Sequence, residues 1–209
     1  MKEIQYDDKN HSLLIKPVQA QDAEAINAAV IHSLKELHSF MDWSHRELSV
    51  ENQIRRIRLS QEMTAKGAGY DFSVFDRKTN KFIMSSSLHA PRVLNKKALS
   101  IGYWTATNHC NKGLATLLTK ILTIVAFDNL SCDRVEIGCN KFNQASRRVI
   151  EKCSFRLDGE FYNYFSEPTK QMIQNGFCAD RTGLLYSMIT QDLPSLAWYQ
   201  DIREKIERH

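Results

Sequence analysis

The chain has 209 residues, of which 43% are hydrophobic and 25% are charged, as expected for one globular domain with a full core. Its formal charge of +4 suits an anionic ligand but does not indicate nucleic-acid binding. The five cysteines form no C-x-x-C pair, and no apolar run approaches the ~18 residues that a membrane span needs. The N-terminal segment has no apolar signal core. The cysteine pattern argues against a disulfide scaffold, and the hydropathy argues against a membrane protein. We therefore expect a cytoplasmic protein with reduced thiols.

The first third of the chain predicts one strand followed by two helices. Residues 11–18 predict the strand, and residues 19–22 predict the entry to a helix with apolar positions at three- and four-residue steps. Ser49 is a good N-cap for a second helix over residues 50–65. The positions expected to face the core are Ala25, Ile26, Ala29, Val30, Leu34 and Leu37 in the first helix, and Ile54, Ile57 and Met63 in the second.

The remainder of the chain predicts strands interrupted by two helices. Residues 166–181 are longer and more polar than a hairpin loop needs, and loops of this size are often functional. Residues 193–209 predict a short helical extension that packs on the body of the domain or on a second subunit. We expect strands over residues 70–75, 81–87, 98–106, 134–140, 155–165 and 182–190, and helices over residues 114–130 and 143–153.

A loop that runs into the long central helix carries the main chemical signal. Lys112 and Gly113 lie at the predicted helix start, where peptide N–H groups have no intrahelical acceptor and the helix dipole favours an anion. Gly113 and Ala115 have little or no side chain, so a ligand can approach the backbone. The chain lacks both the G-x-x-x-x-G-K-[ST] and the G-x-G-x-x-G motifs. The sequence therefore predicts a diphosphate site with no metal.

Four segments together resemble a known family. They are Ile101-Gly102-Tyr103-Trp104, the loop from Cys110 to Thr116, Asn143-Gln144-Ala145-Ser146, and Glu151-Lys152-Cys153-Ser154-Phe155. Their order and spacing resemble the GNAT superfamily of acyl-CoA N-acyltransferases, and within it the RimJ/RimL-type branch of ribosomal-protein N-terminal acetyltransferases. The resemblance covers about residues 11–190 and implies a single α/β (α+β) domain. Its central sheet would be mixed, mostly antiparallel and splayed, with helices on its faces.

Three residues depart from the family pattern. The family usually has Gln or Arg at Cys110, often has Gly at Asn111, and has Gly at Ser154. The first difference removes one side-chain contact to the cofactor, while the backbone N–H groups do not depend on residue type. We therefore expect cofactor binding to be kept.

The resemblance implies acetyl transfer from acetyl-CoA to a primary amine by direct attack, without a metal. Asn143 would hold the pantetheine arm, and Ser146 would give its hydroxyl proton to the departing thiolate, although the two residues also fit a helix cap and a first-turn position. Unpaired N–H groups at the end of the central strand, at Tyr103, Trp104 and Thr105, suit an oxyanion. The cofactor-binding residues expected are Tyr103, Trp104, Thr105, Cys110, Asn111, Lys112, Gly113, Leu114, Ala115, Thr116, Asn143 and Ser146.

The general base and the acceptor stay open. Glu160 and Glu167 are candidate catalytic carboxylates. Glu136 is a third candidate, although it could equally form an ion pair with a nearby arginine. A water chain that leads to backbone carbonyls would also serve as the base. Residues 38–43 would border the acceptor pocket through Phe40, Met41 and Trp43. The acceptor implied is a protein N-terminal α-amine, with polyamines, aminoglycosides or a non-catalytic acyl-CoA-binding role as alternatives. The chain would act as a monomer or a homodimer.

Overall fold

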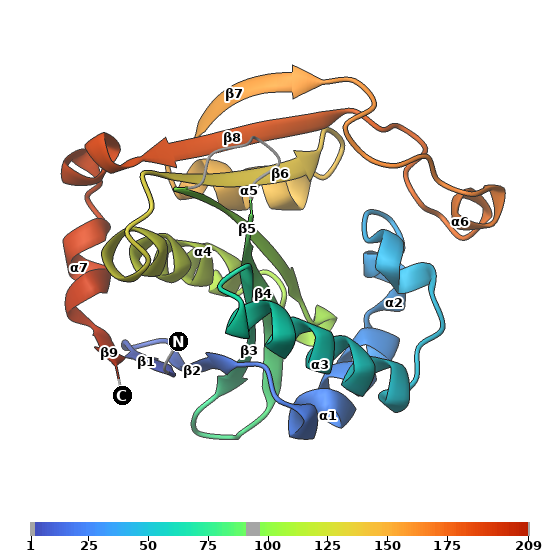
Figure 1. Ribbon diagram of the computed structural model, residues 1–209, viewed down its shortest axis with the longest axis horizontal. Helices are drawn as coiled ribbons and strands as arrows, with labels where there is room; N and C mark the ends of the chain where they lie inside the picture. The colour runs from blue at the N-terminus through green and yellow to red at the C-terminus, as the bar shows by residue number, and fades with distance from the viewer. Residues whose placement is uncertain (1–2, 91–96, 209) are drawn as a thin grey trace.

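The structure is a computed structural model that describes residues 3–90 and 97–208. In this part of the chain nine strands form one sheet in the order β7-β8-β6-β5-β4-β3-β2-β1-β9 (Figure 1). All neighbouring strands are antiparallel except β5 and β6, which are parallel. The strands are β1 Ile4–Asp7, β2 Ser12–Pro17, β3 Gly69–Asp76, β4 Phe82–His89, β5 Ala98–Thr105, β6 Arg134–Asn140, β7 Arg156–Phe161, β8 Gly183–Ile189 and β9 Ile206–Arg208.

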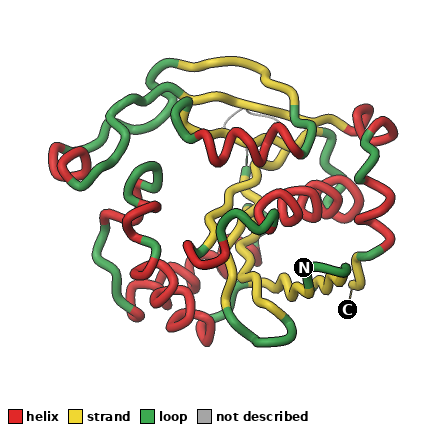
Figure 2. The backbone as a smooth tube through the Cα atoms, turned by 180° about the vertical axis from the view of Figure 1, so that it is seen from behind, coloured by secondary structure: helices red, strands yellow, loops and turns green. Residues whose placement is uncertain are grey.

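Helices cover both faces of the sheet (Figure 2). Val74 and Phe75 are neighbours on β3 but belong to different apolar clusters, so the two clusters lie on opposite faces. The larger cluster lies under α4, and the smaller one lies under α1 and α3. The helices are α1 Ala23–His32, α2 Leu34–Leu37, α3 Val50–Ala65, α4 Leu114–Ile124, α5 Gln144–Lys152, α6 Lys170–Gln174 and α7 Tyr199–Glu204.

The two parallel strands part shortly after they meet. β5 pairs with β6 only over Ala98–Ser100, opposite Arg134–Glu136, whereas its pairing with β4 continues to Thr105. The splayed sheet implied by the resemblance is confirmed. The gap between the two strands is the feature that positions the site.

Most of the predicted elements are present, with differences at their ends. Ser49 caps α3 as expected, because its hydroxyl accepts from the Asn52 N–H at 3.1 Å. The first helix is interrupted at Ser33. Met63 is 45% exposed, so its expected place in the core was wrong. The strand expected over residues 155–165 ends at Phe161.

The polar N-terminal segment and the C-terminal tail pair with each other. β1 and β9 form an antiparallel edge, for which the sequence analysis predicted no strands. Ile202 and Ile206 of the tail are buried in the larger cluster, and α7 packs against α4. The tail therefore packs on the body of the domain. Both chain ends lie at this edge of the sheet (Figure 1).

Ile121 tests the energetic importance of the central helix. Ile121 belongs to α4, and its side chain is completely buried in the larger apolar cluster. We expect Ile121→Ala to lower the free energy of unfolding by about 3 kcal/mol, because the substitution removes buried methylene groups and leaves a cavity. Ile31→Ala, at a position that is 52% exposed, should change it by less than about 0.5 kcal/mol. Urea unfolding of the two variants measures this difference, and equal losses would contradict the assignment of α4 to the core.

Candidate active site

The loop before α4 presents a run of peptide N–H groups. Asn111 and Gly113 both have left-handed backbone, with φ of 60° and 77°. In the described part of the chain, the N–H groups of residues 111–116 have no protein acceptor. Alternating left-handed and ordinary backbone turns consecutive N–H groups toward one concave surface, and the α4 dipole adds partial positive charge. This surface suits a diphosphate, as the sequence analysis predicted.

Cys110 differs from the residues that follow it. Its N–H donates to the Thr107 carbonyl at 3.2 Å, so this amide is not free for a ligand. Its thiol lies 3.7 Å from the Ala106 carbonyl oxygen. Burial raises the pKa of this thiol, and Glu36 raises it further. The thiol therefore stays protonated near neutral pH, which disfavours a nucleophilic role.

Ser146 and Tyr103 form a hydrogen-bonded pair beside the strand gap. The hydroxyls of Tyr103 on β5 and Ser146 in the first turn of α5 are 3.0 Å apart. Asn143 caps α5, because its Oδ1 accepts from the Ser146 N–H at 3.0 Å. Burial raises the pKa of Tyr103, so its phenol stays protonated and can pass a proton to Ser146. Among the described residues the Asn143 side-chain NH₂ has no acceptor, so it is available to a ligand.

The end of β5 offers two of the three amides expected for an oxyanion. The Ala106 N–H donates to Ile83 on the β4 side at 3.0 Å. Because N–H directions alternate along an extended strand, the Trp104 N–H also faces β4, opposite Ser85. The N–H groups of Tyr103 and Thr105 face the gap. Trp104 therefore contributes its ring to the site, and its amide belongs to the sheet.

A cavity of about 380 Å³ passes through the gap and reaches both faces of the sheet. Tyr103, Asn143 and Ser146 line it on the α5 side. Trp104 lines it on the other side, where the Trp43 ring centroid lies 5.9 Å from the Trp104 ring centroid. The residues expected to border the acceptor pocket all line this cavity: Phe40, Met41 and Trp43.

The carboxylates considered as general bases lie elsewhere. Glu160 on β7 is 2.6 Å from Lys141 Nζ, and the 84% exposed Glu167 is 4.0 Å from Arg181. Neither of them lines the 380 Å³ cavity. The structure therefore does not bring these two carboxylates to Ser146.

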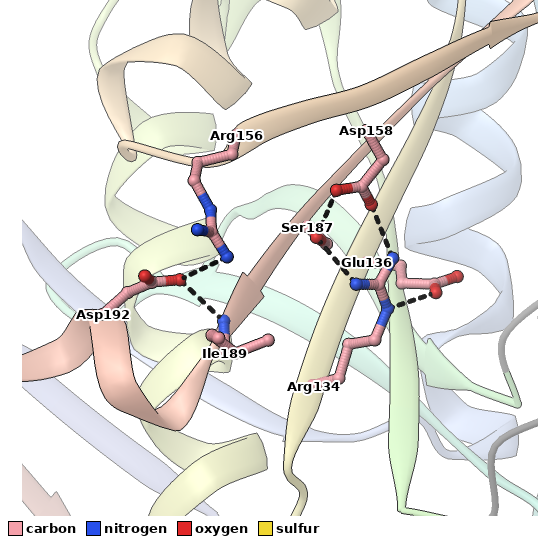
Figure 3. Close-up of polar contacts among 7 residues, drawn as sticks. All are labelled: Arg134, Glu136, Arg156, Asp158, Ser187, Ile189 and Asp192. Atoms are coloured by element: carbon pink, nitrogen blue, oxygen red, sulfur yellow. Dashed lines mark hydrogen bonds and ion pairs between the residues drawn. The ribbon is translucent and has the colours of Figure 1, made fainter.

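Glu136, the third candidate base, forms an ion pair with Arg134 (Figure 3). Its carboxylate accepts from Arg134 Nε at 2.7 Å. The same guanidinium donates to Ser187 and to Asp158, at 2.9 and 2.5 Å. This network ties β6, β7 and β8 together. The ion-pair interpretation of Glu136 is the one that the geometry supports.

A second cavity, of about 530 Å³, adjoins the first. It lies between residues 40–46 and the long segment 165–181, and it shares Phe40, Met41, Asn140 and Phe165 with the first cavity. The long segment carries α6 and lies beside α2, where the Cys178 N–H donates to the Ser39 carbonyl at 2.9 Å (Figures 1 and 2). The two cavities together form a continuous groove on the acceptor side.

Three charged or titratable residues line the cavity although the sequence analysis did not assign them to it. They are Arg56, Asp71 and His89. Asp71 and His89 lie on adjacent strands, with His89 Nε2 at 3.0 Å from Asp71 Oδ1. For Asp71 on β3 and His89 on β4, the sequence signal that could have revealed them was the alternation of polar and apolar residues along each strand.

Residues 3–90 and 97–208 contain neither a metal-binding cluster nor a membrane-spanning helix. No group of three or more His, Cys, Asp or Glu side chains there could hold a metal ion. None of the helices in these ranges has the length and apolar character to cross a membrane. The five cysteines are free.

Free amides at a helix start, next to a parted pair of strands, define the class of acyl-CoA-dependent acyltransferases. The family model of the GNAT acetyltransferase domain matches residues 12–156. The chain belongs to the GNAT acetyltransferase family, and it is an acetyl-CoA-dependent N-acetyltransferase.

Individual relatives agree with this family. YjcK of Bacillus subtilis strain 168, described as a probable N-acetyltransferase, is 28% identical over 72% of this chain and 84% of its own length. Among solved structures, Mycobacterium smegmatis RimJ in complex with CoA-disulfide superposes with a TM-score of 0.81, at 17% identity and with both chains fully covered. The ribosomal L7/L12 α-N-protein acetyltransferase RimL with coenzyme A has a TM-score of 0.74, at 20% identity, over 88% of this chain and 97% of RimL.

Proposed function

We propose that this N-acetyltransferase acetylates the α-amine at the N-terminus of a protein. The observation that supports this acceptor is the second cavity, which continues the first and gives room for residues that follow an N-terminus. Extended peptides bind in grooves of this kind through their backbone and alternate side chains. Of the structural neighbours, RimL is a ribosomal L7/L12 α-N-protein acetyltransferase.

The charges along the groove are close to balanced, which gives a polycation little electrostatic advantage. Asp42 is 3.5 Å from Arg46, and Glu167 is 4.0 Å from Arg181, so opposite charges offset one another at the groove walls. In the inner cavity the positive Arg56 is accompanied by the carboxylate of Asp71. The two linings together hold four carboxylates, Asp42, Asp71, Glu167 and Asp180, and three guanidinium groups, Arg46, Arg56 and Arg181. A polyamine or an aminoglycoside would gain most from a large surplus of carboxylates, and here the surplus is a single group.

In the proposed reaction, the amides of residues 111–116 bind the diphosphate, and the Asn143 side chain binds the pantetheine arm. The N–H groups of Tyr103 and Thr105 stabilise the oxyanion as the amine nitrogen forms its bond to the thioester carbon. When the C–S bond breaks, Ser146 donates its hydroxyl proton to the thiolate, Tyr103 donates its phenolic proton to Ser146, and Tyr103 then takes a proton from solvent. The attacking ammonium nitrogen releases two protons to solvent, so the net result is one proton bound to the CoA thiol and one proton left in solvent.

A panel of acceptors tests this function. The enzyme with acetyl-CoA would receive octapeptides with N-terminal Ser or Ala, the same peptides blocked at the N-terminus but containing Lys, spermidine, or kanamycin. We expect thiol release with the free peptides only, with the acetyl group located on the α-amine by mass spectrometry. Turnover confined to spermidine or kanamycin would establish the small-molecule alternative. Tight acetyl-CoA binding without turnover on any amine would support a regulatory module.

A further inference from the structure

Asp71 and His89 form a hydrogen-bonded pair in the wall of the inner cavity. His89 is the last residue of β4, and its Nε2 lies 3.0 Å from Asp71 Oδ1. The Asp71 side chain is mostly buried, at 19% exposure, whereas the His89 side chain is 47% exposed. A neutral imidazole has one donor and one acceptor nitrogen, so donation from Nε2 leaves the lone pair on Nδ1. The pair thus combines a fixed carboxylate with an accessible imidazole.

The register of the sheet places this pair on the acceptor face. His89 lies opposite Gly69 on β3 and opposite Ser100 on β5. A Cβ atom on residue 69 would collide with the imidazole, so the glycine leaves the space that the ring uses. On β5, Gly102 carries no side chain on this face, between Ser100 and Trp104. The imidazole therefore lies over β3, next to Gly69 and Asp71, in the wall of the same cavity that Gly102, Tyr103 and Trp104 line.

The charged groups around the pair keep Asp71 ionised. Burial acts to raise the pKa of Asp71, but hydrogen bonds from His89 and Ser60 and the charges of His89 and Arg56 together hold it below its usual range. Arg56, on α3, lines the same cavity as the pair. Across the cavity, Tyr103 and Cys139 are the other titratable groups, and burial raises the pKa of both.

We propose that His89, oriented by Asp71, is the general base of acetyl transfer. An α-amine is mostly protonated at neutral pH, since its ordinary pKa is about 8, and an ammonium cannot attack a carbonyl. His89 Nδ1 takes one proton from the ammonium, directly or through one water, and later releases it to solvent. Asp71 is a positioning residue that fixes the ring and stabilises the imidazolium. This assignment rests on the proposed function.

The test compares variants at two pH values with an N-terminal Ser octapeptide as the probe. We expect His89→Ala to lower kcat/KM about 100-fold near pH 7. Near pH 9.5 the loss should shrink to a few-fold, because the α-amine is then already unprotonated. Added imidazole should restore part of the activity at pH 7. Gly69→Ala and Asp71→Asn, which keep the imidazole but disturb its position, should each give an intermediate loss.

The controls separate this assignment from a structural role and from the proposed function. His32→Ala, at the exposed end of α1, should leave the pH profile unchanged. A His89→Ala loss that is equal at both pH values and insensitive to imidazole would show that the residue only supports the fold, and would overturn the proposal. Unchanged activity of His89→Ala would also overturn the assignment of His89 as the base. In that case, peptide acetylation by the wild type would still support the proposed function. Absence of peptide acetylation by the wild type would contradict the proposed function itself.

Discussion

Replacing Ser146 by alanine should lower kcat about 100-fold while the Kd for acetyl-CoA stays within about two-fold of the wild-type value. In the proposed mechanism the hydroxyl is needed only when the thiolate departs, and general acid catalysis contributes a rate enhancement of at least this order. The α5 cap should persist, because Asn143 accepts from the backbone N–H of residue 146, which alanine retains. Thiol release measures kcat, and isothermal titration measures Kd.

Two further variants define the meaning of this result. Tyr103→Phe should show a smaller loss of kcat, since it removes the 3.0 Å hydrogen bond to Ser146 and keeps the proton donor. Ser195→Ala removes a hydroxyl that donates to the Asp192 carbonyl outside the two cavities, and kcat should stay at the wild-type value. An unchanged kcat for Ser146→Ala would remove Ser146 from the mechanism.

Introducing a carboxylate at Gly113 should weaken acetyl-CoA binding about 30-fold. Gly113→Asp places a negative side chain beside the predicted diphosphate, and juxtaposed like charges cost about 2 kcal/mol or more. A Cβ at this position meets no atom of the described protein within 4 Å, so the cost to stability is limited to the left-handed backbone. Isothermal titration with acetyl-CoA measures the change.

Gly67 provides the matched control for this substitution. It has a φ of 66°, compared with 77° at Gly113, and a Cβ there also meets nothing within 4 Å. Gly67→Asp should therefore cause a comparable backbone strain, of about 1 kcal/mol, with no change in acetyl-CoA affinity. Equal affinity losses in the two variants would mean that the effect comes from stability, and would contradict a diphosphate at Gly113.

Local signals explain what the sequence predicted well. The Ser49 cap, the strand Arg134–Asn140 and the Asn143 cap depend on short patterns of polar and apolar residues, and the structure has all three. Gly113 and its neighbours were found in the same way, because the start of a helix determines which amides lack acceptors. The parting of β5 from β6 came from the family resemblance.

Long-range pairing explains what the sequence did not reveal. Asp71 and His89 meet only because β3 and β4 pair with Gly69 opposite His89, and a shift by one residue would turn the histidine to the other face. The direction of the Trp104 amide likewise depends on the hydrogen-bonded register with β4. The edge formed by β1 and β9 joins the two ends of the chain, and their short strands carry too weak a periodicity to be recognised alone.

The proposed diphosphate site at residues 111–116 is tested most directly by amide NMR. Protein labelled with ¹⁵N would be titrated with acetyl-CoA and, separately, with S-acetylpantetheine, which lacks the diphosphate. Large shifts of the amide resonances of residues 111–116 with acetyl-CoA, and small ones with S-acetylpantetheine, are the predicted result. If these amides stay unmoved while acetyl-CoA binds and shifts resonances elsewhere, the site described here is wrong.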